Sequence, residues 1–513
     1  MMAKYLAGID VGTTGARCAI FDVCGRVIGG AYREYGADYP KPGWVDQDGL
    51  LLISQTMEAC QAGISDAGID PTEIASIGFS TQRSVTGPVD AAGQPVRPMI
   101  SWQDARTGRE VEEMGKLIDA DEYYAISGVP MGTTWVITKL LWMRRNEPEL
   151  YEKTARFTQN QDLVLKAFGA DAFHTDISDM AFYGVWDVRN VCWDQRLMDL
   201  FDVTPEMFGA PTPSGTQVGT ISRSMAEKTG FAPGTPVCVG AGDQNCSVIG
   251  MGAIRSGMAT VTLGTAGLAI LAVDTPVPGF GGMMITNHVL PGMWEVEGLS
   301  NAAASSYRWY RDTCGALEVE RQANGGGDAY RALDTLAAQA PPGSRGLLFM
   351  PYLATAGTPR WNANARAAFL GMSLAHGRPE LTRAVMEGVA LEIRDMMEGW
   401  LQKGMQVDVL RLGGGATHSP LWNQIQADVY GRPVQTLEVG ESTVLGAALL
   451  GGVGAGVFAD VPEGVDAMVH VAGELEPNMD NHRIYEDLYG AYASAYADLS
   501  NHTFDALARL QAD

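Results

Sequence analysis

Two short turns made of glycine and threonine constrain the fold of this chain more than any other feature. Residues 5–22 predict a β-hairpin whose turn reads Gly-Thr-Thr-Gly at positions 12–15. Residues 258–263 predict another strand, which meets the turn Gly-Thr-Ala-Gly at positions 264–267. Turns of this composition are small enough for the backbone to approach a ligand closely. Because the two halves begin alike, the sequence predicts a duplicated, two-lobed protein with its chemistry between the lobes.

A single carboxylate stands shortly before the second turn. The strand-like run 236–239 breaks at Gly240 and Gly242, which leaves Asp243 at the strand end before an apolar, helix-like segment at 247–251. A carboxylate in such a place is able to accept a proton from a reacting group. No Ser/His/Asp or Cys/His arrangement among the motifs competes with it as the candidate catalytic group.

Length and composition exclude several classes of protein. A chain of 513 residues is too long for one hydrophobic core, so two large domains are expected. The formal charge of −24 argues against binding of nucleic acid, although small anions held by local loops stay open. The sequence shows no apolar run long enough for a membrane span, and its N-terminus enters a strand pattern at once rather than a signal peptide. The scattered cysteines and histidines show no metal-binding spacing, which favours a reducing cytoplasm without structural zinc.

The first Gly/Thr turn offers free backbone N–H groups and two hydroxyls, and Arg17 follows it closely. This set of donors suits a phosphate cradle. An ordinary glycine-rich hairpin is an equal alternative. Asp10, ahead of the turn, could hold Mg²⁺ through its waters or act only as a turn former.

Two polar clusters each follow an apolar run, which is where open α/β sheets usually place ligand groups. Their candidate binding residues are Gln82, Arg83, Trp102 and Asp104. An aromatic ring beside amide, guanidinium and carboxylate groups suits a polyhydroxylated ligand, because C–H faces stack on the ring while hydroxyls pair with the polar groups. A surface loop with a half-buried tryptophan is the alternative interpretation.

A run of three glycines at 413–415 follows a predicted strand at 409–412, and Ser419 then suits the N-cap of a helix over 421–430. Three glycines allow a flat ring to approach the backbone, so a nucleotide base is expected there. The two Gly/Thr turns, the strand-end acid and this loop together indicate phosphoryl transfer across a cleft, since that reaction needs mainly positioning and charge neutralisation. In this interpretation Asp243 accepts the proton of the attacking hydroxyl.

Several further elements follow from pattern alone. They are a helix over 50–67 begun by acids after a Pro/Gly loop, a surface connector over 206–220, a strand over 344–353, an amphipathic helix over 380–401, a helix with small residues on one face over 441–453, and a closing helix with a tyrosine-rich stripe over 485–499.

At this point the chain is seen to resemble the FGGY family of carbohydrate kinases, within the larger group that shares the actin, hexokinase and heat-shock-70 ATPase fold. The resemblance covers nearly the whole chain and rests on five motifs in family order, which read GIDVGTT at 8–14, GWVDQD at 43–48, GAGDQ at 240–244, LGTAG at 263–267 and GGG at 413–415. It implies an α/β protein of two lobes with duplicated, ribonuclease H-like mixed sheets. The expected lobes are 1–250, carrying the sugar and the first phosphate loop, and 251–513, carrying the nucleotide.

The resemblance also implies roles for individual residues. Asp243 matches the family's catalytic base, and Asp10 would help it to hold Mg²⁺. The residues that match ATP-binding positions are Gly12, Thr13, Thr14 and Arg17 in the first phosphate loop, Gly264 and Thr265 in the second, Gly414 and Gly415 in the adenosine loop, and Arg308 and Ser419 near the nucleotide. The residues that match the sugar pocket are Gln82, Arg83, Trp102, Asp104, Asp243 and Gln244. Relatives are commonly oligomers, so a homodimer is expected.

The acceptor is less constrained than the reaction. Glycerol kinases place Glu after the arginine of the first polar cluster, where this chain has Ser84, and their glycerol-packing tyrosine aligns near Thr134. Both changes leave room for a longer substrate. Xylulokinases carry Met-His and Asp-Asn where this chain has Arg83-Ser84 and Asp243-Gln244. A bidentate contact of Arg83 with hydroxyls or an acid group is expected.

We therefore expect a kinase of a xylulose-like ketopentose. A glycerol-like polyol or a small dihydroxy ketone that resembles a quorum signal is the alternative acceptor. Outside the class, a chaperone-type ATPase would use the same fold, but it would normally attach a separate peptide-binding domain. A dinucleotide oxidoreductase is disfavoured because the N-terminal glycine turn opens a strand instead of a helix.

Overall fold

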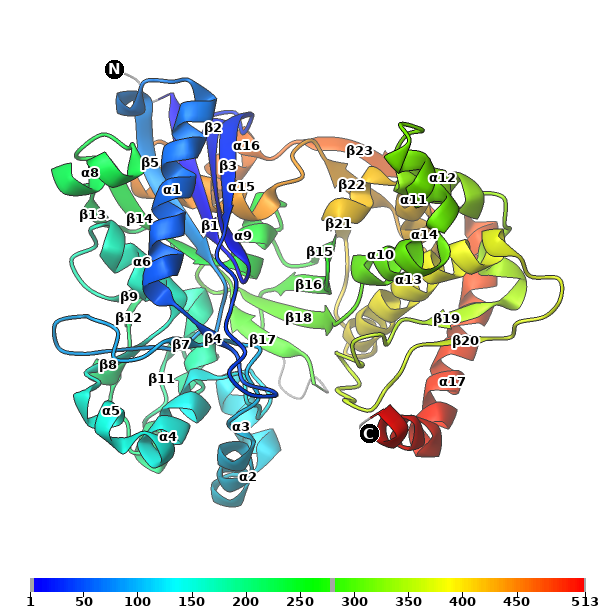
Figure 1. Cartoon of the computed structure of the whole chain (residues 1–513), viewed down its shortest axis with the longest axis horizontal. Coiled ribbons are helices and arrows are strands. Elements are labelled where there is room, and N and C mark those ends of the chain that lie inside the picture. Colours follow the sequence, from blue (N-terminus) through cyan, green and yellow to red (C-terminus); the bar gives the residue numbers. More distant parts are fainter. Residues whose placement is uncertain (1–3, 277–281, 512–513) are drawn as a thin grey trace.

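The computed structural model describes residues 4–276 and 282–511, which form two sheet-centred lobes side by side (Figure 1). The first sheet has six strands in the order β13-β14-β5-β1-β2-β3. Their bounds are β13 Gln217–Thr220, β14 Pro236–Gly242, β5 Ile74–Thr81, β1 Tyr5–Val11, β2 Gly15–Asp22 and β3 Val27–Glu34. Helix α1 (Gly49–Ala67) packs against β2 and β3, and Asp48 caps its N-terminus by accepting from two backbone N–H groups, as the acids before it predict.

The second sheet has seven strands in the order β17-β18-β16-β15-β21-β22-β23. Their bounds are β17 Met284–Asn287, β18 Trp294–Ser300, β16 Gly267–Val273, β15 Met258–Leu263, β21 Val409–Gly413, β22 Val434–Leu437 and β23 Val471–Leu475. The helices of this lobe are α10 Ala304–Cys314, α11 Ala316–Ala323, α12 Ala329–Ala337, α13 Arg378–Gln402, α14 Pro420–Tyr430 and α17 Met479–Gln511. The expected tyrosine stripe of the closing helix is buried at Tyr485, Tyr492 and Tyr496.

Apart from the additional edge strand β17, the two sheets share one topology, which confirms the predicted duplication. In the first, β1 pairs antiparallel with β2 across the Gly/Thr turn and parallel with β5. In the second, β15 pairs antiparallel with β16 across the other turn and parallel with β21. The two turns therefore occupy equivalent places in the two lobes.

A smaller layer of short elements extends the first lobe below its sheet in Figure 1. Its helices are α2 Gly108–Leu117, α3 Ala120–Ser127, α4 Val136–Asn146, α5 Pro148–Lys153 and α7 Gln195–Phe201, whereas α6 Asn160–Phe168 packs against β5 and β14 of the first sheet. Its strands are β4 Asp46–Gln47, β6 Gly87–Val89, β7 Met99–Ile100, β8 Arg156–Thr158, β9 His174–Asp176, β10 Trp186–Asp187, β11 Cys192–Trp193 and β12 Ala210–Thr212. An aromatic and aliphatic core that includes Trp135, Phe182 and Trp186 holds this layer together. Helix α8 (Arg223–Thr229) lies at the far end of the first sheet, against α1.

Three predicted elements differ from the structure. Strand β14 does not break at Gly240 but runs to Gly242, and helix α9 (Asp243–Gly250) begins directly at Asp243. The predicted connector 206–220 contains two strands, of which β13 forms the edge of the first sheet. The strand predicted over 344–353 is only three residues long (β19, Leu348–Met350), pairs with β20 (Ala368–Leu370), and follows a short 3₁₀ turn.

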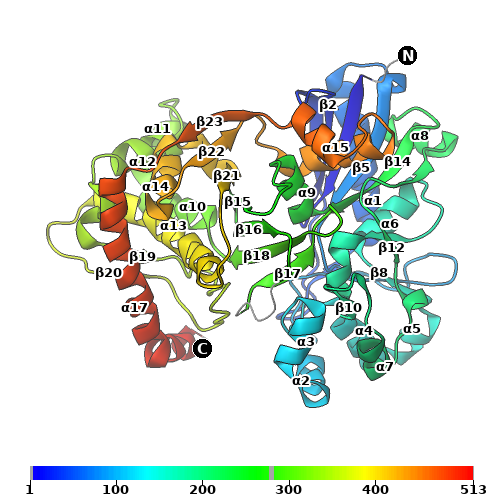
Figure 2. The ribbon, with the colours of Figure 1, turned by 180° about the vertical axis from the view of Figure 1, so that it is seen from behind.

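The lobes are not two consecutive halves of the chain. Helices α15 (Ser442–Gly454) and α16 (Val461–Met468) come from the C-terminal half, yet α15 packs against β1, β5 and α9. Figure 2 shows this orange segment beside the first sheet. Leu445 and Leu449 of α15 share one apolar cluster with Leu6 and Phe21. The chain therefore leaves the first lobe between α9 and β15 and returns to it after β22.

Glycines allow α15 to lie directly on the strands beneath it. A Cβ added at Gly78 of β5 would lie 1.9 Å from the carbonyl oxygen of Ala447, and one added at Gly8 of β1 would lie 2.1 Å from that of Val444. No real Cβ makes such contacts, so a side chain here would push the helix away from the sheet. The small-residue face that the sequence shows over 441–453 thus serves close packing.

Replacing Gly78 with Ala is expected to lower the free energy of unfolding by about 1–3 kcal/mol, the usual cost of overpacking. Thermal and urea unfolding followed by circular dichroism would measure the change. Gly490→Ala in α17 is the matched control, because an added Cβ there meets nothing within 4 Å and alanine favours a helix. Equal effects of the two substitutions would contradict this account of the packing.

Within the described residues, no helix is both long enough and apolar enough to cross a membrane.

Candidate active site

Three parallel strands of the first sheet end at one edge and bring the predicted reacting groups together. Register pairs Asp10 with Ser80 across β1 and β5, and Ala241 with Ser80 across β14 and β5. Asp243 is the first residue of α9, directly after β14. The hydroxyl of Ser80 donates to Oδ1 of Asp10 over 2.7 Å. Asp10 and Asp243 therefore lie at the same edge of the sheet, on the two sides of β5.

The environment of the two acids is poorly solvated. Burial is the main cause that raises the pKa of Asp10 to about 7, and the negative charge of Asp243 adds to it. Burial also raises the pKa of Asp243, while the Arg83 guanidinium opposes that shift. The Asp243 side chain is still 31% exposed, so a ligand is able to reach it. Two neighbouring carboxylates that disfavour each other's charge form a place where a cation is stabilising.

Arg83 is held by a residue from the other lobe. Its two terminal nitrogens donate to the two carboxylate oxygens of Glu297 on β18, over 2.7 and 2.8 Å. Its Nε lies 3.4 Å from Oδ1 of Asp243, and its guanidinium lies 4.6 Å from the ring centre of Phe182. Glu297 is fully buried and also accepts from the Thr286 hydroxyl. The expected bidentate contact of Arg83 with an acceptor is thus already occupied by Glu297 in this structure.

The remaining acceptor candidates divide into two groups. Gln82 is buried beside the strand ends, and Gln244 is partly exposed next to Asp243. The indole of Trp102 is 37% exposed, and its Nε1 donates to the Thr13 hydroxyl over 3.1 Å. Trp102 contacts the first Gly/Thr turn directly, and Gln82 reaches it through Gln47, whereas Gln244 follows Asp243 in the chain.

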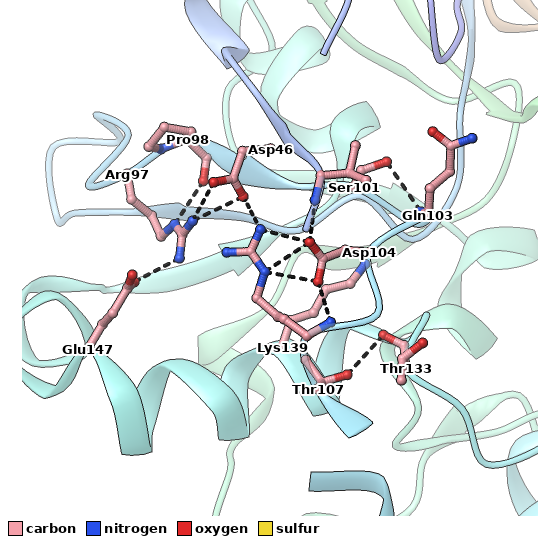
Figure 3. A network of polar contacts seen from close by, with 12 residues as sticks. Asp46, Arg97, Pro98, Ser101, Gln103, Asp104, Thr107, Thr133, Lys139 and Glu147 are labelled. Carbon is pink, nitrogen blue, oxygen red and sulfur yellow. Dashed lines mark hydrogen bonds and ion pairs between the residues drawn. The ribbon is translucent and has the colours of Figure 1, made fainter. Parts of the chain in front are cut away.

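Asp104 occupies a different kind of position, inside the ion-pair network drawn in Figure 3. Its carboxylate accepts from the backbone N–H of Val45 over 2.6 Å and from the guanidinium of Arg106, and neither charged side chain is exposed. Asp46 joins the network by pairing with Arg106 and with Arg97. Since both oxygens of Asp104 are occupied and buried, the structure does not support the expected direct contact with the acceptor. Asp104 instead fixes the loop that carries Trp102.

The predicted first phosphate loop is the turn between β1 and β2. Gly12 N–H donates to the carbonyl of Gly15, and the Thr14 hydroxyl lies 3.2 Å from the Tyr32 hydroxyl. Arg17, the expected phosphate cation, pairs with Glu441 at the start of α15 over 2.7 Å. Both side chains of this pair are about half exposed, so phosphate would compete with Glu441 for Arg17.

The glycine run borders a cavity in the other lobe through Gly415, and the second turn contacts one of the residues that line this cavity, Ala304. The N-terminus of α10 contacts the second turn, because Ala304 N–H donates to the Gly264 carbonyl and the Ser305 hydroxyl donates to that of Thr265. A cavity of about 580 Å³ lies here, lined by Ala304, Tyr307, Asp328, Tyr330, Arg331, Asp334, Gly415, Ala416, His418, Ser419 and Trp422. Its size and aromatic lining suit a nucleoside.

The structure places the predicted nucleotide residues unevenly around this cavity. Gly415 and Ser419 line it, and the Ser419 hydroxyl caps α14 by accepting from Trp422 N–H, as predicted. Gly414 precedes them with a φ of 80°, and a Cβ there would lie 2.5 Å from the Leu263 carbonyl oxygen. Arg308 is exposed on α10 and is not a lining residue. The sequence reasoning missed Tyr307, whose hydroxyl donates to Asp334 over 2.9 Å, although the small-residue run before it was a usable signal.

No cluster of three or more His, Cys, Asp or Glu side chains suited to a metal occurs in the described part of the chain. A Mg²⁺ ion at Asp10 and Asp243 would therefore rely on water and substrate phosphates for most of its ligands, which is this ion's usual habit. The two poorly solvated carboxylates fit such a role.

Comparison with known proteins decides the family. The N-terminal domain of the FGGY family of carbohydrate kinases matches residues 5–250, and its C-terminal domain matches residues 259–455. The chain belongs to the FGGY family of carbohydrate kinases. It is therefore a phosphotransferase with an alcohol group as acceptor, and FGGY kinases use ATP.

The relatives of this chain are named after different substrates, although their sequence identities to it are similar. A xylulose kinase of Staphylococcus epidermidis is 28% identical over 99% of both chains. An autoinducer-2 kinase of Salmonella typhimurium is 30% identical over 96% of this chain and 94% of the relative. A glycerol kinase of Pseudothermotoga lettingae is 29% identical over 96% and 98%. The family is thus established, whereas the acceptor is not.

Solved structures confirm the predicted two-lobed architecture of the actin-like ATPase group. The ligand-bound xylulose kinase from Lactobacillus acidophilus superposes with a TM-score of 0.90 at 24% identity, covering 98% of this chain and 99% of that one. Plasmodium falciparum glycerol kinase with ADP gives 0.84 at 19% identity, covering 96% and 98%. At these identities the likeness concerns the fold alone.

Proposed function

We propose that this kinase transfers the γ-phosphate of ATP to a hydroxyl of a xylulose-like ketopentose. The observation that carries the proposal is the placement of Asp243, a partly exposed carboxylate that directly follows β14 at the strand ends and lies 3.4 Å from Arg83. Xylulose kinases recur among the relatives, which favours a ketopentose.

In the proposed reaction Asp243 accepts the proton of the attacking hydroxyl. Arg83, 3.4 Å away, favours the ionised carboxylate that this role requires. Trp102 offers an apolar face to the sugar, and Gln82 and Gln244 offer amides to its hydroxyls. Thr13, Thr14 and Arg17 bind phosphate oxygens from the first lobe, while Gly264 and Thr265 do so from the second. Gly414, Gly415 and Ser419 hold the nucleoside, with Arg308 at the margin.

We assign Mg²⁺ to Asp10 and Asp243, where it would neutralise charge on the transferring phosphate. The cytoplasm is the proposed compartment, which is supported by the absence of disulfides among the cysteines of the described residues. A homodimer is the proposed assembly.

A small dihydroxy ketone is the second candidate acceptor, because the autoinducer-2 kinase relative is 30% identical to this chain, close to the 28% of the xylulose kinase. The side chain of Ser84 is short, and Thr134 is partly exposed, so neither fills the space that a carboxylate and a ring would take. Both features favour an acceptor longer than glycerol.

The test is ADP release with Mg-ATP against a panel of pentuloses, hexuloses, alditols, glycerol and small dihydroxy ketones. We expect one ketopentose to raise turnover by about tenfold or more over the acceptor-free rate, since acceptor binding should close the lobes around ATP. Glycerol as the best acceptor would contradict the wider pocket. Absence of stimulation by every sugar would contradict the proposal, and stimulation by a dihydroxy ketone alone would favour the second candidate.

A further inference from the structure

One buried glutamine joins the acceptor candidates to the first phosphate loop. Gln47 in β4 is 1% exposed and uses both ends of its amide. Its Nε2 donates to the backbone carbonyl of Thr13 over 2.9 Å, and its Oε1 accepts from Nε2 of Gln82 over 3.0 Å. A continuous chain of hydrogen bonds therefore runs from Gln82 through Gln47 to the phosphate loop.

The direction of this chain is fixed by chemistry. A backbone carbonyl only accepts, so Gln47 must present its NH₂ group to Thr13 and its oxygen to Gln82. Gln82 must in turn present its own NH₂ group to Gln47. The Oε1 of Gln82 is then left as a buried acceptor, and it has no hydrogen-bond partner in the described residues.

An unpartnered buried acceptor is costly, which indicates that a donor belongs beside it. A hydroxyl of a polyol or sugar is such a donor. A hydroxyl that donates to this oxygen would polarise the hydrogen bonds that Gln82 and Gln47 make. It would also fix the orientation of both amides up to the carbonyl of Thr13. The acceptor site and the phosphate loop are thus linked through two side chains.

A second contact reaches Thr13 from the acceptor side. The indole Nε1 of Trp102 donates to the Thr13 hydroxyl over 3.1 Å, while the ring itself is 37% exposed. Thr13 is consequently held at its carbonyl by Gln47 and at its side chain by Trp102. A sugar that stacks on Trp102 and bonds to Gln82 would restrain both supports of the loop together.

We infer that Gln47 is a positioning residue that couples occupancy of the acceptor site to the geometry of the first phosphate loop. The inference rests on the proposed function. By thermodynamic reciprocity, an acceptor that orders Thr13 must strengthen ATP binding, and ATP must strengthen acceptor binding by the same factor. Gln47 would in this way limit ATP hydrolysis when no acceptor is present.

Two substitutions test this coupling. Gln47→Leu removes both hydrogen bonds at similar volume. Gln47→Glu retains an oxygen for Gln82 but, when ionised, cannot donate to the carbonyl of Thr13. Gln55→Leu is the matched control, because Gln55 lies in the neighbouring helix α1 and its amide donates to the carboxylate of Glu58 over 3.2 Å, away from Thr13 and Gln82 in the chain of hydrogen bonds. Thermal unfolding of each variant reports whether it is folded.

The measurements are ADP release with and without the best acceptor, and the affinity for a non-hydrolysable ATP analogue with and without that acceptor. We expect the acceptor stimulation of ADP release to be about tenfold smaller in both Gln47 variants than in the unaltered protein. The affinity for the ATP analogue without acceptor should change less than about twofold. Gln55→Leu should keep the stimulation of the unaltered protein.

A proportional fall of basal and stimulated rates would assign Gln47 a purely structural role and overturn the inference, as would unchanged stimulation in both variants. If only Gln47→Leu fails to fold, Gln47→Glu decides the matter. Absence of acceptor stimulation in the unaltered protein would instead overturn the proposed function, and the inference with it.

Discussion

Replacing Asp243 with Asn is expected to lower kcat by about 10²–10⁴-fold, the range that a positioned general base contributes. Asparagine keeps the shape of the side chain but cannot accept the proton of the attacking hydroxyl. The first turn of α9 should persist, since its backbone contacts do not depend on the second carboxylate oxygen. Arg83 retains its bidentate partner Glu297, so the surrounding geometry should also persist.

Steady-state kinetics with the best acceptor would measure this loss, and titration with an ATP analogue would show whether nucleotide binding survives. We expect analogue affinity to stay within about threefold, because the nucleoside cavity lies in the other lobe. Asp466→Asn, an exposed acid on α16, is the control for removal of one negative charge. A variant at Asp243 with nearly normal kcat would refute its role as the base.

Replacing Glu297 with Ala is expected to destabilise the protein by about 3–5 kcal/mol, the usual cost of leaving one partner of a buried ion pair alone. Arg83 would keep its charge in a site where only 11% of its side chain reaches solvent. The freed guanidinium would turn toward Asp243, its nearest remaining acid, and change the geometry of the proposed base. We therefore expect kcat to fall together with stability.

A double-mutant cycle with Arg83→Met separates the pair from other effects. The double variant should be less destabilised than the sum of the single variants, because each single change leaves the other charge unpaired. Glu73→Ala breaks the exposed ion pair with Lys4 and serves as the surface control, for which little change in stability is expected. Additive effects of the Arg83 and Glu297 substitutions, measured by urea unfolding, would contradict the pairing.

Much of the fold could be predicted because its signals are local. The two Gly/Thr turns fixed the equivalent hairpins of the lobes, and Asp48 and Ser419 fixed the starts of α1 and α14 through side chains that accept from nearby backbone N–H groups. The ends of parallel strands meet at one edge of a sheet, so the positions of Asp10, Gln82 and Asp243 at the ends of strand-like runs were enough to predict that they lie close together.

Other features depend on segments that are distant in the sequence. The buried network around Asp104 joins it to Val45, Asp46 and Arg106, and nothing in the local pattern separates such an acid from one that binds sugar. The sequence around Glu297 assigns it no role, and only its pairing with Arg83, 214 positions away, gives it one.

The sequence by itself thus determined the reaction class, the duplicated lobes and the identity of the proposed base, because turns, caps and strand ends are set by neighbouring residues. The tertiary structure alone decided which polar side chains face a ligand and which face each other, and that α15 returns to the first lobe. The physical reason is that the burial and partner of a charge are properties of packing between distant segments, and the same residue type serves either purpose until that packing is formed.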